Sequence, residues 1–423
     1  MLASGCMALP SRPTTVLGLR ANAGQFVLLV GINALVGGMV GQERAVVPLL
    51  ATEVFGLEAT STALTFLVGF GLAKAITNLV AGVLADRFGR KPVLVAGWLV
   101  GLPVPILLIL APDWTWVIAA NVLLGVNQGL TWSTTVLMKI DLVGRGRRGL
   151  ALGLNESSGY LAVALVAFLT GLVAEEAGLR PAPFFIGLAI AGLGLGASVL
   201  FVRETRGHAV LDAAATNART NAVDGWRRIA WRTSVADPSL SAASQAGFVN
   251  NLNDGLAWAM LPTVQAAAGL SIAQIGMLSA VYPATWGLAQ VATGALSDRY
   301  GRRPLIVGGM LLQAIAIASI AATGGFWPWL ACAVALGLGT AMVYPTLIAV
   351  IADVAPSPQR GAVVGIYRFW RDLGFAAGAL LVGLVAAAAG ASIAILAVAG
   401  LTASSGIVVA VRMGETRAND AAN

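Results

Sequence analysis

The chain has 423 residues, of which 58% are hydrophobic and 11% are charged, whereas soluble domains have about 45–50% apolar and about 25% charged residues. This composition excludes a water-soluble globular protein, because so few charged side chains cannot cover its surface. The formal net charge of +7 would suit nucleic-acid binding in a soluble protein, but the placement of the charges described below does not.

Apolar stretches of about 20 residues, the length of a membrane-spanning helix, recur along the chain. We predict twelve such helices, because the stretches are too long and too uniformly apolar for the alternating strands of a membrane β-barrel. Their approximate ranges are 24–50, 60–84, 92–111, 115–138, 150–174, 182–202, 244–268, 272–296, 304–323, 327–351, 361–388 and 391–412. The predicted fold is an all-α polytopic membrane protein. Its parts are a tail at 1–22, a six-helix bundle at 23–202, a linker at 203–241, a second six-helix bundle at 242–412 and a tail at 413–423.

Charged side chains inside the predicted helices mark a candidate site, because a charge at the bilayer centre costs at least about 2.5–3.5 kcal/mol and usually pairs or faces a wet cavity. The first half contributes Glu43, Arg44, Lys74 and Glu156, with Asn155 next to Glu156. Two of them have other interpretations. Glu43 could be solvated near the outer surface, and the long stem of Lys74 could reach an interface.

In the linker, the apolar residues Trp226, Ile229 and Ala230 have Arg227, Arg228 and Arg232 nearby. This pattern could form a short amphipathic helix on anionic lipid. An ordinary interhelical loop fits the same residues equally well.

The second half contributes Asn250, Asp254, Arg368, Arg371 and Asp372 to the candidate site. Asn250 and Asp254 are four residues apart and therefore share a helix face, and Arg368 and Asp372 have the same spacing and could pair.

A loop motif occurs once in each half, 212 residues apart. The first copy, at residues 82–91, contains Gly82, Asp86, Arg87, Gly89 and Arg90, and the second contains Gly294, Asp298, Arg299, Gly301 and Arg302. The same offset relates Asp141 to Asp353 without a gap. The chain is therefore an internal duplication.

The duplication also relates Glu156 to Arg368 and Gln42 to Asp254. Because the two halves would place related residues at corresponding depths, we expect the polar ends of helices 24–50 and 244–268 to face one another across a cavity. Glu156 and Arg368 could likewise meet there or alternate with a substrate.

Positive charge gathers on one side of the predicted membrane protein. With both termini placed inside, the cytoplasmic segments hold 21 of the 26 Lys and Arg residues, and the outer loops hold only Arg180. This bias predicts a cytoplasmic (inner) membrane protein with both termini in the cytoplasm. The basic charge thus reflects topology, and we expect no nucleic-acid partner.

The loop motif resembles that of the major facilitator superfamily of secondary transporters, and the resemblance covers nearly the whole chain. It implies two bundles around a central cavity, alternating access, and the charge-free helices 92–111, 182–202, 304–323 and 391–412 outermost. It also implies that the loop stabilises the outward-open state by contacts across the halves. Asp86 and Asp298 could act as a breakable latch there, so Asp86→Asn is expected to reduce transport without affecting insertion.

A carboxylate in such a cavity can change its proton affinity between conformations. Glu156 and Asp254 are therefore candidate proton carriers, although ion pairs that never titrate fit the pattern equally well. Proton antiporters of the superfamily commonly have an Arg where this chain has Asn121, before Gly125, and a Gly-Pro pair where it has Gly159-Tyr160. Drug–proton antiport therefore stays open.

The function that we predict is secondary transport of a small solute, proton-coupled, by a monomer in the lipid bilayer, with efflux of drugs or metabolites as one form. Uptake or exchange of a small organic anion is the alternative, because arginine forks bind carboxylates well. A receptor on a transporter scaffold is a further alternative, and the absence of counterflow would favour it. Nucleotide-binding and hydrolase motifs do not occur, so an enzyme is not expected. Cys6, Cys332 and His208 are too scattered for a metal site, and we expect no cofactor.

Overall fold

The computed structural model describes residues 16–57, 64–143, 148–214, 225–355 and 359–416. The tail around Cys6 lies outside these residues. Within them the regular elements are all helices, and no strand occurs. The all-α prediction is confirmed.

The first half runs from the N-terminal region to α8. Its helices are α1 (Ala23–Arg44), α2 (Val47–Leu49), η1 (Leu50–Val54), α3 (Thr65–Phe88), α4 (Arg90–Gly101), α5 (Pro103–Leu110), α6 (Trp114–Val143), α7 (Arg148–Ala177) and α8 (Ala182–Leu200). Helices α4 and α5 form one predicted span, interrupted where Pro103 cannot supply a backbone N–H.

The second half repeats this order. Its helices are α11 (Pro238–Ala259), α12 (Leu261–Ala267), α13 (Ile272–Tyr300), α14 (Arg302–Ala322), α15 (Phe326–Val354), α16 (Arg360–Ala389) and α17 (Ala391–Arg412). Each of the twelve predicted spans falls on one long helix or on consecutive helices.

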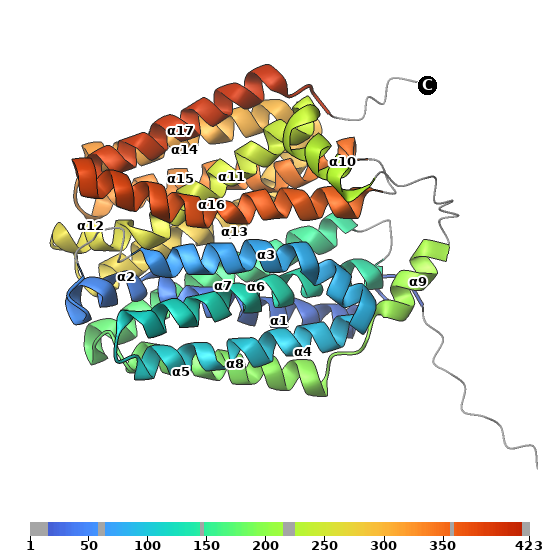
Figure 1. Ribbon diagram of the computed structural model, residues 1–423, viewed down its shortest axis with the longest axis horizontal. Helices are drawn as coiled ribbons and strands as arrows, with labels where there is room; N and C mark the ends of the chain where they lie inside the picture. Colours follow the sequence, from blue (N-terminus) through green and yellow to red (C-terminus); the bar gives the residue numbers. More distant parts are fainter. Residues whose placement is uncertain (1–15, 58–63, 144–147, 215–224, 356–358, 417–423) are drawn as a thin grey trace, which may run out of the picture.

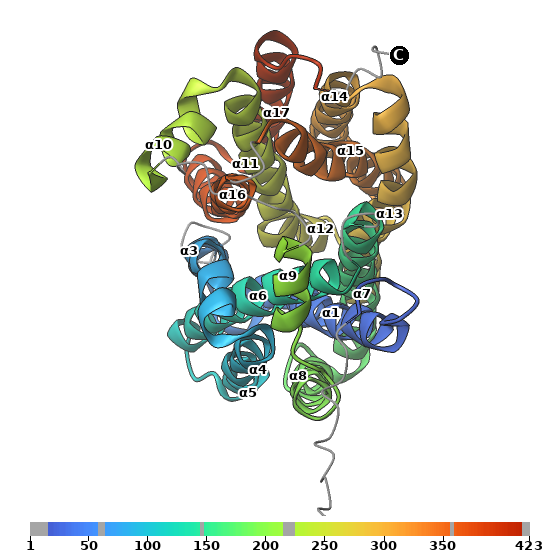
Figure 2. The ribbon, with the colours of Figure 1, turned by 90° about the vertical axis from the view of Figure 1, so that its right-hand side faces the viewer.

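The two halves lie side by side as separate bundles (Figure 1). Viewed along the helices, α4, α5 and α8 lie on the outer side of one bundle and α14 and α17 on the outer side of the other (Figure 2). The bundles meet where α3 packs on α16 and α7 packs on α13. The helices without internal charge are thus outermost, as the resemblance implied.

The α7–α13 contact is close enough to require glycine on both helices. A Cβ atom added to Gly171 would lie 2.7 Å from the Cα atom of Gly276. Small residues permit such approach of membrane helices, where no hydrophobic effect drives association.

Nine helical segments among the described residues are long and apolar enough to cross a membrane. They are Ala23–Val54, Thr65–Phe88, Arg90–Leu110, Gly153–Ala177, Ala182–Leu200, Arg302–Ala322, Phe326–Val354, Gly361–Ala389 and Ala391–Arg412. The other three predicted spans form the long helices α6, α11 and α13, whose buried faces carry many polar side chains.

The predicted linker contains α9 (Arg206–Ala214), α10 (Trp226–Trp231) and the π-helix η3 (Arg232–Ala236). In α10, Ile229 is buried, whereas Trp226 and Trp231 are 52% and 61% exposed. A short helix therefore forms in the linker, and its contact with lipid stays a prediction. α11 already begins at Pro238, where the side chain of Asp237 caps its first N–H groups.

Candidate functional site between the two halves

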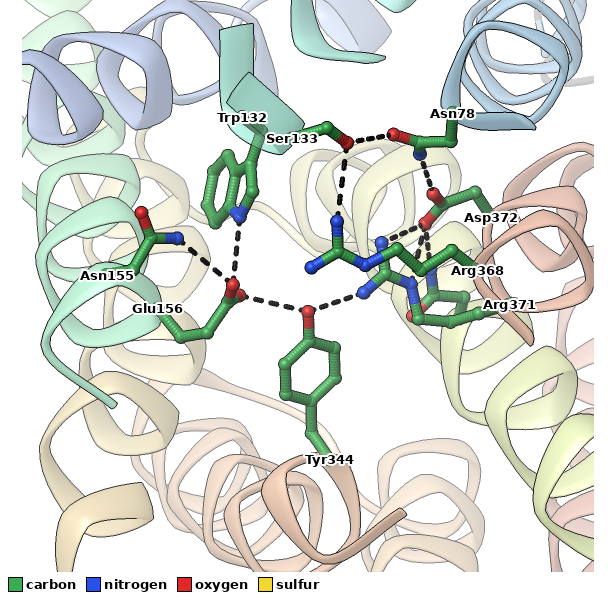
Figure 3. Close-up of polar contacts among 10 residues, drawn as sticks. Asn78, Trp132, Ser133, Asn155, Glu156, Tyr344, Arg368, Arg371 and Asp372 are labelled. Atoms are coloured by element: carbon green, nitrogen blue, oxygen red, sulfur yellow. Dashed lines mark hydrogen bonds and ion pairs between the residues drawn. The ribbon is translucent and has the colours of Figure 1, made fainter. Parts of the chain in front are cut away.

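Glu156 of α7 is buried at the centre of the molecule and bonds to both halves (Figure 3). Its Oε1 accepts hydrogen bonds from Trp132 Nε1 of α6 at 3.0 Å and from Asn155 Nδ2 at 3.1 Å. Its Oε2 accepts one from the hydroxyl of Tyr344, on α15 of the second half, at 2.9 Å. All three donors are neutral, so among the described residues no cation contacts the carboxyl directly.

Tyr344 connects Glu156 to Arg371 of α16. Arg371 Nη1 donates to the Tyr344 hydroxyl at 2.6 Å, and Arg371 Nη2 lies 2.7 Å from Asp372 Oδ1. Asp372 is fully buried and also accepts from Asn78 Nδ2 of α3. A continuous polar chain therefore joins α7, α15, α16 and α3.

Arg368 takes a different partner from the ones that the repeat and the helix spacing suggested. It donates to Ser133 Oγ of α6 at 3.3 Å, and Ser133 in turn donates to Asn78 Oδ1 at 2.7 Å. Arg371, not Arg368, holds Asp372, and Arg371 is also the residue linked to Glu156. The duplication predicts how deep a side chain lies along the helices, but it does not predict which neighbour that side chain contacts.

Arg44 and Asp254 form the second ionic contact between the halves. Arg44 Nη2 lies 2.7 Å from both carboxylate oxygens, and both side chains are buried. The guanidinium carbon also lies 5.4 Å from the Trp258 ring centroid and 5.9 Å from that of Tyr282, within cation–π range. The structure thus brings the polar ends of α1 and α11 together.

Two predicted site residues lie elsewhere. Glu43 is fully buried, not solvated, and neither of its carboxylate oxygens has a hydrogen-bond partner among the described residues. Asn250 points into its own half, where its Oδ1 accepts from Gln313 of α14 at 3.1 Å. Asn250 and Asp254 share a face of α11, but that face meets different neighbours at different depths.

The loop motif forms the same contacts in both halves. Arg90 Nε lies 3.2 Å from Asp141 Oδ2, and Arg302 Nε lies 3.3 Å from Asp353 Oδ2. These contacts explain why the two aspartates recur with the motif. Gly89 has φ 100° and Gly301 φ 99°, a backbone conformation that favours glycine.

Asp86 is 73% exposed at its side chain and pairs with Arg90 at 2.5 Å, within its own half. Arg87 and Arg299 each lie over the ring of the next residue, at 5.3 and 5.5 Å. Gly82 and Gly294 have no atom within 4 Å of an added Cβ. The side chain of Asp298 lies outside the described part of the chain.

Sequence reasoning missed the acids that complete these loops. Glu204 accepts hydrogen bonds from the backbone N–H groups of Arg90 and Lys91, both at 3.0 Å, and Glu415 accepts from those of Arg302 and Arg303. A signal existed, because each half ends in the tripeptide Glu-Thr-Arg, at 204–206 and 415–417.

Lys139 was also missed, since it follows the predicted helix 115–138 and was counted as cytoplasmic. It is fully buried on α6 and donates to the backbone oxygen of Leu29 at 3.0 Å. The bridging residues Trp132 and Tyr344 gave no signal, because apolar helices commonly contain such residues.

The sequence matches the profile of the Major Facilitator Superfamily over residues 26–249 and again over 243–423. The chain belongs to this superfamily and is a multi-pass, all-α membrane protein.

Individual relatives match shorter segments. Multidrug resistance protein MdtH of Aeromonas hydrophila is 35% identical over 116 residues, which cover 26% of this chain and 29% of that protein. Citrate exporter 1 of Aspergillus niger is 27% identical over 141 residues, covering 33% of this chain and 27% of that protein. Hexuronate transporter of Bacillus subtilis is 25% identical over 143 residues, covering 34% of each. Each match spans about a third or less of the relative's length.

Proposed function

We propose that this chain is a monomeric, proton-coupled secondary transporter that moves a small solute across the cytoplasmic membrane by alternating access, and that it is not an enzyme. The superfamily and the names of the relatives, which include a multidrug resistance protein, a citrate exporter and a hexuronate transporter, support transport of small solutes. The one-sided basic charge supports cytoplasmic termini.

The observation that carries the proposal is the set of buried polar contacts between the halves. Glu156 with Tyr344, Arg44 with Asp254, and the Asn78–Asp372 hydrogen bond each join one bundle to the other. Contacts of this kind must break when the bundles rock. A solute or a proton that binds these groups better in one state would shift the balance between states.

Two contacts indicate which way this conformation faces. Arg44 with Asp254 and Gly171 with Gly276 lie toward the helix ends remote from the Gly89 loop. With the motif loops in the cytoplasm, the halves are in contact at the outer end, and we assign this conformation to an inward-facing state. Among the described residues Asp86 pairs with Arg90 of its own half, which fits this state, since the latch is expected to act in the outward-open one.

Of the two candidate proton carriers, Glu156 is the better supported. Asp254 is held by a guanidinium through both carboxylate oxygens, an arrangement that stabilises its charged form. Glu156 is bonded only to neutral donors, so a proton can be added without breaking an ion pair. Asp254 is then an ionic contact between the halves.

The test uses purified protein in proteoliposomes loaded with a pH-sensitive dye. Ethidium, citrate and glucuronate are added in turn, and proton movement and counterflow of each solute are recorded. We expect solute-dependent proton movement in the unmodified protein. Glu156→Gln should abolish proton movement while counterflow persists, and Glu53→Gln, which changes an exposed carboxylate, should leave both unchanged.

Other outcomes decide against parts of the proposal. Counterflow of a solute without proton movement would show that transport is not coupled to protons. Binding of a solute without any counterflow would favour a receptor, and neither binding nor counterflow for the three solutes would withdraw the proposed function.

A further inference from the structure

Lys74 of α3 is a buried cation without an ion pair. It is 8% exposed, and its Nζ lies 5.1–5.9 Å from three aromatic ring centroids. The rings belong to Phe70, Trp132 and Phe375. Among the described residues, no oxygen accepts a hydrogen bond from Nζ. An ammonium group has three donors, so this one is free to bind an anionic oxygen.

Two acids in the electrostatic neighbourhood of Lys74 are already occupied. Asp372 is bonded to Arg371 at 2.7 Å and Asp254 to Arg44 at 2.7 Å. Each of these aspartates therefore has a guanidinium of its own.

The third acid is Glu156. Arg368 is a second cation near it that has no ion pair among the described residues. Arg368 is half-buried and its Nη1 donates only to the neutral hydroxyl of Ser133. Glu156 is bonded to neutral donors, with no cation in direct contact. Within the described part of the site, Lys74 and Arg368 thus have no ion pair. Lys139 has none either, but its ammonium group is bonded to the backbone oxygen of Leu29 at 3.0 Å.

The two cations flank the same turn of α6 from opposite halves. Lys74, on α3 of the first half, faces the ring of Trp132, and Arg368, on α16 of the second half, bonds to the adjacent Ser133. We propose that Lys74 and Arg368 together form a binding subsite for the carboxylate group of a small aromatic acid, whose apolar body packs against the rings around Lys74. This inference rests on the proposed function and names the substrate class of the same site.

Charge and shape both favour this class of ligand. A carboxylate can bond to an ammonium and a guanidinium at once, whereas a cation would meet two like charges at short range. Phe70 is fully buried, so an aromatic body would contact the edges of Phe375 and Trp132, which are 5% and 9% exposed. Because the two cations come from different halves, a bound carboxylate would link the bundles.

The probes that test the proposal are 2-naphthoate, its uncharged amide 2-naphthamide, and a trimethylammonium analogue of the same ring. Binding to the purified full-length protein is measured by isothermal titration calorimetry. We expect 2-naphthoate to bind at least tenfold more tightly than either of the other two. Tighter binding of the cation, or equal binding of all three, or no binding of 2-naphthoate would overturn the proposal, and this comparison needs no variant.

Variants then locate the site. Lys74→Gln and Arg368→Gln should each weaken 2-naphthoate binding at least tenfold without changing the affinity for the amide, and Lys74→Arg should restore part of the loss. Lys91→Gln, a lysine at the motif loop, is the matched control and should bind normally. Unchanged 2-naphthoate affinity in both glutamine variants would contradict the subsite.

The two proposals fail in different ways. If 2-naphthoate binds as expected but shows no counterflow, the subsite stands and transport is withdrawn. If ethidium moves with protons while 2-naphthoate does not bind, transport stands and the anion subsite is withdrawn.

Discussion

At the scale of single residues, the question at Glu43 is whether its buried carboxyl group carries a charge. It is fully buried on α1, and the neighbouring Arg44 is committed to Asp254. An isolated carboxylate in such a place is too costly to remain ionised. The side chain of Asn121 faces Glu43, and its Oδ1 also lacks a partner. A neutral carboxyl group can donate to that oxygen, which satisfies both groups.

We therefore expect Glu43→Gln to melt at the same temperature as the unmodified protein or above it, because the amide keeps the shape and supplies a donor. Asp254→Asn is the comparison, since it leaves the Arg44 guanidinium buried without its anion and should cost about 3–5 kcal/mol. Thermal unfolding in detergent, followed by intrinsic fluorescence, measures both. A large loss of stability in Glu43→Gln would show that the carboxyl is charged and paired.

At the scale of elements, Glu204 fixes the start of α4 against the end of the first half. Burial raises the pKa of its carboxyl, but the N–H groups of Arg206, Lys91, Arg90 and Thr205 outweigh burial, and the pKa lies below its ordinary value of 4.5. The negative charge also suits the positive N-terminal end of a helix.

Glu204→Gln should destabilise the protein by about 1 kcal/mol at neutral pH, the scale of a lost helix cap. Because the folded pKa is lowered, the contribution of Glu204 is fully present above pH 4.5 and is lost as the pH falls through the folded pKa. The variant should therefore lose less stability than the unmodified protein when the pH falls below 4.5. Glu176→Gln, an exposed carboxylate on α7, is the control. The same dependence of stability on pH in all three proteins would rule out this role of Glu204.

At the scale of the whole molecule, the α7–α13 contact sets how closely the bundles can approach. Gly171 and Gly276 meet at the backbone, so a side chain at either position cannot be accommodated by a rotamer change alone. The helices, and with them the bundles, would have to separate at the ends remote from the Gly89 loop, which we propose to be the outer ends.

Gly171→Leu is therefore expected to hold the outer end open and to slow transport. The measurement is labelling of Ser279→Cys, near Arg44 in a pocket of the second half, by a membrane-impermeant maleimide in a background without native cysteines. Labelling from outside should rise several-fold. Gly192→Leu on α8, where an added Cβ meets no atom within 4 Å, is the matched control, and equal labelling in the two variants would disprove the steric account.

The sequence by itself determined the number and order of the helices and the duplication, whereas the outermost positions of the charge-free helices were implied by the resemblance to the superfamily. Helix number, order and duplication are properties of the one-dimensional pattern, because apolar length decides where a helix crosses lipid. The repeated Asp141 and Asp353 indicated only the duplication, and the structure showed their contact with the motif. The Glu-Thr-Arg tripeptides could have revealed Glu204 and Glu415.

Only the tertiary structure decided which partner each buried charge takes. Glu156 bonds to Tyr344, Arg371 in place of Arg368 holds Asp372, and Lys74 lies among aromatic rings. Spacing along a helix fixes which residues share a face, but the rotation of that helix about its axis and the depth of each turn fix what the face meets. Those quantities are set by the packing of twelve spans against one another, and no local pattern contains them.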